Sequence, residues 1–151
     1  VSMDKLYFGK LLSGFFLILS VQLFLLLIFV VAAKVDGISF DLSLAVHIKW
    51  LLLSVVASFP IMTLQSFVTA KTRNFSKAVG VATIGSMLNF VLIFINENLT
   101  KFFPYSQPMI ALRSRSLTDM SLIDLTIFLV VNSLYSLLFY KLTVAALKKN
   151  E

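Results

Sequence analysis

The sequence predicts an all-α polytopic membrane protein with four transmembrane helices, and three observations support this prediction. Hydrophobic residues make up 59% of the chain and charged residues 13%, whereas soluble domains are closer to half apolar and a quarter charged. Four apolar runs are long enough to cross a hydrocarbon core of about 30 Å. The two central runs, between Trp50 and Ile95, are joined by seven residues that include three cations and no acid. We expect a single transmembrane domain over residues 1–151.

The first expected span covers residues 11–33, which are twenty-three residues without a charge. At about 1.5 Å per residue this run slightly exceeds the hydrocarbon core, so it would cross with some tilt. Gln22 lies near its middle. Three small residues lie near its start, namely Gly9, Ser13 and Gly14. They would either allow another helix to approach closely or face the lipid.

Residues 34–49 are expected to form a mixed-charge extracellular loop, with a turn at Asp36 and Gly37. The alternating apolar residues at 38–44 are compatible with a short strand or with an interfacial segment. His47 is the only histidine. We interpret it as a loop residue, because no second histidine or adjacent carboxylate pair would complete a metal or catalytic site.

The second expected span covers residues 50–70, with Trp50 as an interfacial anchor. Pro60 lies at its centre, where it removes one backbone hydrogen bond and is expected to kink the helix. Gln65 follows five residues later. Residues 71–77 are expected to form a tight cytoplasmic turn, and its cations are Lys71, Arg73 and Lys77.

The third expected span covers residues 78–95. One face carries small or polar residues at intervals of three to four, whereas the opposite face is bulky. This pattern predicts close packing against a neighbouring helix, although an accidental distribution of common membrane residues would look the same. The residues of the small face are Ala78, Ala82, Gly85, Ser86 and Asn89.

Residues 96–121 form the longest polar stretch and are expected to be an extracellular loop. The aromatic residues around Pro104 indicate a segment that lies at the membrane interface or dips into it. The fourth expected span covers residues 122–140, and Ser116 or Thr118 is the expected cap of this helix. Within it, Asp124 lies one turn inside the outer edge, and Asn132 belongs to a polar stripe.

The cations predict which side of the membrane each loop occupies. With both termini cytoplasmic, eight cations lie inside and five lie outside. This bias favours the arrangement with both ends inside, as the positive-inside rule expects. The inside set is Lys5, Lys10, Lys71, Arg73, Lys77, Lys141, Lys148 and Lys149. The outside set is Lys34, Lys49, Lys101, Arg113 and Arg115.

Several classes of chemistry have no motif in this chain. It has no cysteine, which excludes disulfides and thiolate metal sites. It has no Gly-x-x-x-x-Gly-Lys-Ser/Thr loop, no His-Glu-x-x-His and no Gly-x-Ser-x-Gly. We therefore expect no ATP hydrolysis by the chain alone, no enzymatic activity, no cofactor and no metal. The net charge of +6 is attributed to loops on one side of a bilayer rather than to nucleic-acid binding.

Four amide side chains are expected at mid-membrane depth: Gln22, Gln65, Asn89 and Asn132. A buried amide is costly in lipid unless it faces protein or water, and a hydrogen bond between helices contributes on the order of 0.6–2 kcal/mol. Two interpretations follow. Either the amides hold the bundle together, which we favour, or they line a translocation path.

The order of several short motifs resembles the permease subunits of type-2 ABC exporters, and most closely the bacterial lantibiotic-protection permeases. A span with Phe-Pro-Ile-Met-Thr-Leu-Gln at residues 59–65 is followed by a turn with Arg-Asn-Phe at 73–75. A Gly-x-x-x-x-Gly helix then covers 78–85, and an aromatic-Pro-aromatic segment at 103–105 precedes the last span. The likeness covers roughly residues 45–145.

The resemblance implies a permease that works with a separate ATP-binding subunit and with a second permease subunit. It implies that an amphipathic peptide, such as a lantibiotic, is expelled from the lipid bilayer. Such permeases usually have six spans, so the four here would be the last four, forming the C-terminal part of a six-helix permease. Val1 as the first residue fits this expectation, and residues 2–10 would hold the end of the segment that contacts the ATPase.

The alternative is a small integral membrane protein that transports nothing, such as an immunity protein or an assembly factor. It would need no ATPase and would be complete with four spans.

Overall fold

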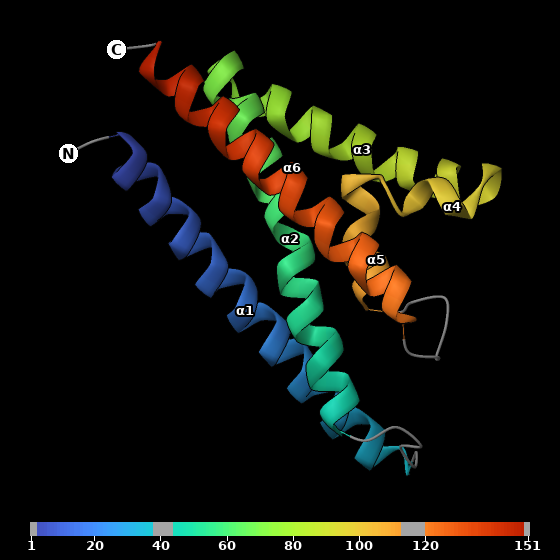
Figure 1. Ribbon diagram of the computed structural model, residues 1–151. Coiled ribbons are helices and arrows are strands. Elements are labelled where there is room, and N and C mark those ends of the chain that lie inside the picture. Colours follow the sequence, from blue (N-terminus) through green and yellow to red (C-terminus); the bar gives the residue numbers. More distant parts are fainter. Residues whose placement is uncertain (1–2, 38–43, 113–119, 150–151) are drawn as a thin grey trace.

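The computed structural model describes residues 3–37, 44–112 and 120–149, and this part of the chain is helical without a strand (Figure 1). Four of its helices are long and apolar enough to cross a membrane. They confirm the predicted all-α, multi-pass architecture. The four spans are α1 (Met3–Val35), α2 (Leu44–Thr72), α3 (Phe75–Ile95) and α6 (Leu122–Lys148). Three short elements lie between α3 and α6, namely α4 (Glu97–Thr100), η1 (Pro104–Ser106) and α5 (Gln107–Ala111).

The spans alternate in direction, so the chain termini lie at the same end of the bundle (Figure 1). We call this the turn end, because the short connection between α2 and α3 also lies there. The opposite end, where α1 ends and where α2 and α6 begin, is the loop end. Four spans require this arrangement, since each crossing reverses the side of the chain.

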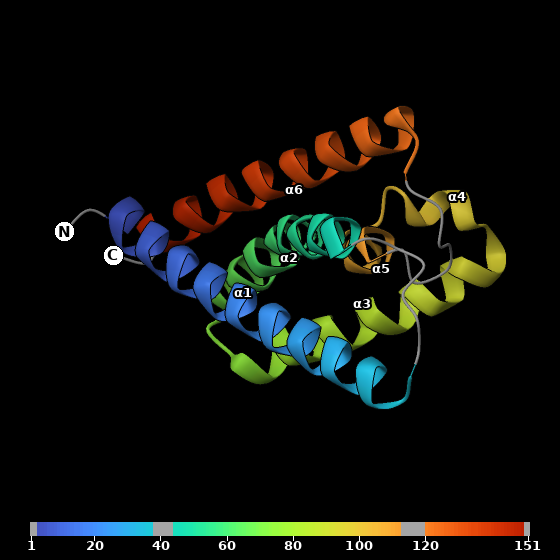
Figure 2. The same cartoon turned by 90° about the horizontal axis from the view of Figure 1, so that it is seen from below.

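Helix α2 is the centre of the bundle, and it contacts α1, α3, α5 and α6 (Figure 2). Its hydroxyl side chains bond within their own helix, because lipid offers them no partner. Ser58 Oγ donates to the Ser54 carbonyl at 2.9 Å, and Ser66 Oγ donates to the Met62 carbonyl at 2.8 Å. The polar residues of α2 therefore cost little in an apolar environment.

Helix α1 packs along α2 through apolar and aromatic contacts. The rings of Phe15 and Phe59 stack at 5.8 Å between centroids. A β-carbon at Gly14 would press on the sulfur of Met62, so the expected close approach occurs at this glycine. Tyr7, Leu11 and Ala33 of α1 are buried, but none of its most apolar 18-residue window is buried.

The helices are longer than the apolar runs predicted. Helix α2 begins at Leu44, so the interpretation of His47 as a loop residue is wrong. Its ring lies between the rings of Phe29 and Trp50, at 5.9 and 5.6 Å. Helix formation continues beyond the hydrocarbon core because nothing in these flanks breaks it. The alternation expected at residues 38–43 lies outside the described residues.

The expected turn at residues 71–77 contracts to Arg73 and Asn74. Arg73 adopts the left-handed region with a φ of 49°, which ends α2. Asn74 then caps α3, because its side-chain oxygen accepts from the Lys77 backbone N–H at 3.2 Å.

The cap of α6 is Ser121, whose side chain accepts from the Asp124 backbone N–H at 3.1 Å. Ser116 and Thr118, the caps expected from the sequence, lie outside the described residues.

Candidate functional site

Residues 101–112 turn back between the spans, and we call them the re-entrant segment. They contain η1 and α5, and α5 packs against α2. Ala111 is fully buried, in one cluster with Ala57 of α2 and Phe128 of α6. Ser106 and Gln107 are also fully buried. The segment is therefore enclosed by the helices rather than spread over the end of the bundle.

Gln107 and Asn132 form the centre of a polar network between this segment and α6. The Asn132 amide nitrogen donates to Gln107 Oε1 at 2.9 Å and to the Phe128 carbonyl at 2.7 Å. Gln107 Nε2 in turn donates to the carbonyls of Lys101 and Phe103, at 3.0 and 3.1 Å. Gln107 thus satisfies the backbone of its own irregular segment and joins it to a span.

The depth of Asn132 follows from its place in α6. It lies ten residues beyond Leu122 in a helix of 27 residues, or about 15 Å along the axis. This distance is half of a hydrocarbon core of about 30 Å. Irregular backbone at this depth persists only where protein encloses it or where it lines a cavity.

Two further amides hold the re-entrant segment from the other side. Ser106 Oγ donates to Asn89 Oδ1 of α3, and Gln65 Nε2 of α2 donates to the Tyr105 hydroxyl oxygen. Three of the four amides singled out in the sequence, from three different spans, therefore bond to three consecutive residues. Those residues are Tyr105, Ser106 and Gln107.

The Tyr105 ring lies against Gly85 of α3. A β-carbon at Gly85 would overlap this ring, so glycine is required for the contact. Burial raises the pKa of the Tyr105 phenol, and the hydrogen bond from Gln65 acts in the opposite direction. The hydroxyl therefore stays protonated at neutral pH and remains a hydrogen-bonding group.

The predicted small face of α3 is divided. Ala78, Gly85 and Asn89 are buried, Ala82 is half-buried and Ser86 is exposed. Gly85 and Asn89 contact the re-entrant segment. The sequence pattern predicted close packing of this face but could not identify this segment as the partner.

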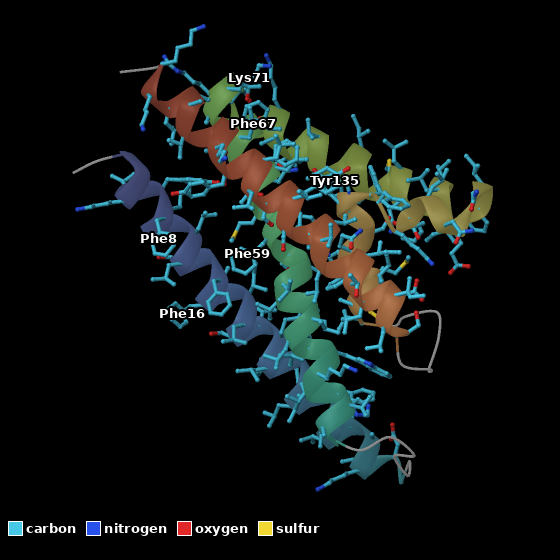
Figure 3. All side chains as sticks on the ribbon, viewed as in Figure 1. Phe8, Phe16, Phe59, Phe67, Lys71 and Tyr135 are labelled. Atoms are coloured by element: carbon cyan, nitrogen blue, oxygen red, sulfur yellow. The ribbon has the colours of Figure 1, made fainter. Side chains whose placement is uncertain are left out.

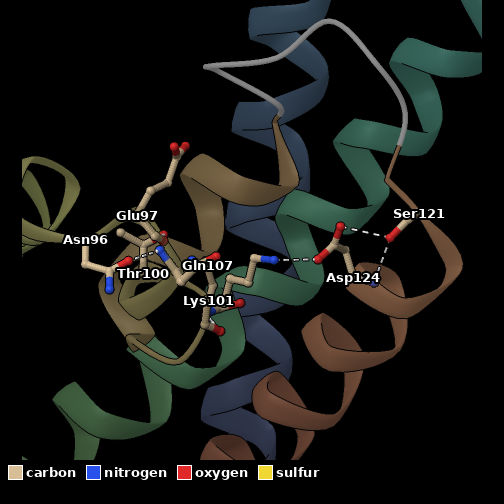
Figure 4. A network of polar contacts seen from close by, with 8 residues as sticks. Asn96, Glu97, Thr100, Lys101, Gln107, Ser121 and Asp124 are labelled. Carbon is tan, nitrogen blue, oxygen red and sulfur yellow. Dashed lines mark hydrogen bonds and ion pairs between the residues drawn. The ribbon is translucent and has the colours of Figure 1, made fainter.

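An ion pair closes the network at the loop end (Figure 4). Lys101 Nζ lies 2.8 Å from Asp124 Oδ1, and both side chains are about two-fifths exposed. Ser121 Oγ donates to the other carboxylate oxygen of Asp124 at 2.8 Å. The start of α6 and the start of the re-entrant segment are thereby joined.

Pro60 is fully buried in the middle of α2, and the helix continues through it. Hydroxyl groups donate hydrogen bonds to backbone carbonyls near this proline. Thr63 Oγ1 donates to the carbonyls of Phe59 and Pro60, at 2.9 and 3.1 Å. Thr143 of α6 reaches the Thr63 carbonyl at 3.5 Å.

The remaining predicted residues lie apart from the network. Gln22 is half-buried in α1, and no side-chain hydrogen bond joins it to the described part of the chain. The basic-turn residues Lys71, Arg73 and Lys77 are exposed at the turn end. The ammonium group of Lys71 stands over the Phe67 ring, 5.7 Å from its centroid.

Sequence reasoning missed Gln107, Ser106 and Tyr105 as partners of the amides. One signal was available, because three mid-membrane amides need partners and the aromatic and proline-rich segment is the nearest source of uncharged polar groups. Within the described residues, no group of three histidine, aspartate or glutamate side chains is placed to bind a metal. The buried centre of the network is built from amides and hydroxyls, which bind by hydrogen bonds and carry no charge.

Comparisons of the chain with protein-family models, with curated proteins and with solved structures find no match.

Proposed function

We propose that the chain is a membrane-spanning permease subunit, or part of one, that works with a separate ATP-binding subunit. The supporting observation is the re-entrant segment, which is held between three spans at the middle of the bundle. The likeness of residues 45–145 to lantibiotic-protection permeases supports the partners and the substrate class. These are an ATPase subunit, a second permease subunit and an amphipathic peptide expelled from the bilayer.

The polar network gives this proposal a physical basis. Gln65, Asn89 and Asn132 come from α2, α3 and α6, and each bonds to the re-entrant segment. Any movement of one span relative to another must stretch or exchange these bonds. The segment is therefore suited to act as a barrier whose position depends on the arrangement of the spans.

The same amides serve as the polar wall of the path when the segment moves. One acceptor is already available, since Asn132 Oδ1 is buried and has no hydrogen-bond donor in the described structure. A peptide backbone N–H matches such an acceptor. In the proposed orientation both termini and the basic turn of Lys71, Arg73 and Lys77 face the cytoplasm.

The test is resistance to a cationic amphipathic peptide in cells that express the chain with its ATPase. We expect the ATPase to co-purify with the chain, and the inhibitory peptide concentration to rise several-fold. Asn132→Leu should lower the resistance while the protein remains in the membrane, because the barrier loses its central bond. Ser133→Leu, one residue away on an exposed face, is the matched control.

The opposite result has a clear meaning. If no ATPase co-purifies and peptide sensitivity is unchanged, the permease proposal fails. In that case the amide contacts serve the bundle alone, as in a small integral membrane protein without transport.

A further inference from the structure

An apolar groove of about 380 Å³ lies between the re-entrant segment and α6. Phe102 of the segment forms part of its lining and is 56% exposed. The remaining lining residues belong to α6, and they are Val131, Leu134, Tyr135 and Leu138. Every residue of this lining is apolar or aromatic.

Asp124 lies on the same face of α6 as this groove. Val131, Tyr135 and Leu138 follow it by seven, eleven and fourteen residues. At 3.6 residues per turn, all three lie within about 40° of its direction around the helix axis. Tyr135 lies about half-way along α6 (Figure 3), whereas Asp124 belongs to the first turn. The groove is therefore in line with a carboxylate toward the loop end.

The ion-pair partner of this carboxylate comes from the other wall of the groove. Lys101 directly precedes Phe102, and its Nζ lies 2.8 Å from Asp124 Oδ1 (Figure 4). Both side chains of the pair are about two-fifths exposed. An ion pair that is this exposed is weak, so a second ammonium group can reach the carboxylate and take the place of Lys101.

Lys101 also belongs to the network that holds the re-entrant segment. Its carbonyl and that of Phe103 accept from Gln107 Nε2, at 3.0 and 3.1 Å. Gln107 Oε1 accepts in turn from Asn132 of α6 at 2.9 Å. A movement of Lys101 and Phe102 therefore acts directly on the bonds between this segment and α6.

We propose that the groove and Asp124 together bind a cationic amphipathic peptide. The apolar side chains of the peptide lie in the groove, and one of its ammonium groups binds the Asp124 carboxylate. Lys101 occupies this carboxylate in the resting protein and is displaced by the peptide. This inference rests on the proposed function, and it names Asp124 as the residue that selects a positively charged substrate.

Charge complementarity determines the choice of occupant. An apolar surface that leads to a carboxylate matches a molecule that is apolar along its length and positive at one end. The phosphate of a phospholipid would instead meet Asp124 as a like charge. Asp124 and Leu138 are fourteen residues apart, or about 21 Å along the axis, which a peptide helix of about 14 residues matches in length.

The test is disulfide cross-linking between a Leu134→Cys variant and a synthetic peptide with one cysteine, because the chain has no cysteine of its own. The variant is reconstituted without an ATPase in nanodiscs of phosphatidylcholine. The probe is a leucine-rich helix of about 14 residues with lysines at one end, and the same peptide with glutamines there is the neutral reference. We expect the lysine peptide to cross-link about threefold more, the effect of one partly exposed ion pair.

Two substitutions in this background assign the preference to the ion pair. Asp124→Asn should abolish the difference between the peptides, because the new amide carries no charge. Lys101→Met should raise cross-linking of the lysine peptide about threefold, because the competing ammonium group is gone. The double variant should lack this gain. A gain that persists without the carboxylate would mean that Lys101 acts only by loosening the segment, which overturns the proposed displacement.

The neutral peptide and a second cysteine position serve as controls. Cross-linking of the neutral peptide reports in each variant that the groove is intact. Leu129→Cys, about 140° from Asp124 around the helix axis, should cross-link both peptides equally. An equal reaction of the two peptides at Leu134→Cys, or a preference that survives Asp124→Asn, would overturn the proposal. A Leu134→Cys dimer that the peptide does not diminish would place a second copy on the groove and would also overturn it.

These measurements can fail independently of the permease proposal, because cross-linking requires neither an ATPase nor transport. Resistance with a co-purifying ATPase but without cross-linking would overturn this site and leave the permease function standing. Charge-dependent cross-linking without a co-purifying ATPase would support the site in a membrane protein that binds the peptide and does not transport it.

Discussion

Helix α1 and the re-entrant segment occupy the same bundle but are held in opposite ways. Helix α1 is apolar on all sides and contacts its neighbours through rings and methylene groups, such as Phe15 on Phe59. The re-entrant segment has side-chain hydrogen bonds to three spans, through Gln65, Asn89 and Asn132. Lipid can take the place of the apolar neighbours of α1. It offers no hydrogen-bond partner to the polar side chains of the re-entrant segment.

The difference shows which residues specify structure inside a membrane. Apolar surface does not drive helices together there, because lipid tails are as apolar as leucine. Close packing at small residues and hydrogen bonds between polar side chains decide the arrangement. We therefore expect substitutions in the re-entrant network to have larger effects than comparable substitutions in α1.

The largest effect is expected from Gly85→Val. The new side chain overlaps the Tyr105 ring, displaces the segment and breaks its bonds to Gln65 and Asn89. We expect the free energy of unfolding to fall by about 3 kcal/mol, measured by SDS titration in mixed micelles. Gly80→Val is the matched control, because a β-carbon at Gly80 meets no atom within 4 Å. Equal losses in the two variants would disprove the Tyr105 contact.

Asn132→Leu is expected to cost about 2 kcal/mol, because it leaves Gln107 Oε1 buried without its donor. The same unfolding titration measures this loss. The double variant Asn132→Leu, Gln107→Leu should be less unstable than the sum of the two single variants, since both unpaired groups are then gone. Strict additivity would show that the two amides do not interact.

Gly14→Val tests α1 by the same kind of overlap. Here the atom that is met is the sulfur of Met62, which lies near the end of a flexible side chain and can move. We expect a loss of about 1 kcal/mol. Gly9→Val, where a β-carbon meets nothing within 4 Å, should cost less. A loss as large as that of Gly85→Val would remove the contrast between the two regions.

Lys101→Met is expected to have the smallest effect, about 0.5 kcal/mol, because its ion pair with Asp124 is partly exposed and screened. The difference from wild type should shrink as the salt concentration of the titration is raised. Lys77→Met, which removes an exposed cation without an ion pair in the described structure, is the control. A loss that is independent of salt would mean that Lys101 acts by packing.

The number of spans could be predicted from the sequence because hydrophobic length is a property of each segment alone. The helix ends could not, since hydropathy marks the hydrocarbon core and not the point where helical backbone stops. Helix α2 stops at Arg73 only because that residue adopts a left-handed conformation before the Asn74 cap. Such a stop depends on local backbone geometry, which composition does not record.

The re-entrant segment was only partly predictable. The aromatic residues around Pro104 indicated an approach to the membrane, and the amides indicated buried hydrogen bonds. The pairing of Gln65 with Tyr105 joins residues forty positions apart, and that of Asn132 with Gln107 joins residues twenty-five apart. No periodicity within one segment encodes such a pairing, so it becomes visible only in three dimensions.

The contact between the first and last turns of the chain has a consequence for biosynthesis. Tyr7 and Leu11 are buried against Val144, with Tyr140 and Leu147 beside them. A ribosome makes Tyr7 more than 130 residues before Tyr140, Val144 and Leu147. The first turns of α1 must therefore remain in the bilayer without these contacts while the intervening spans are inserted.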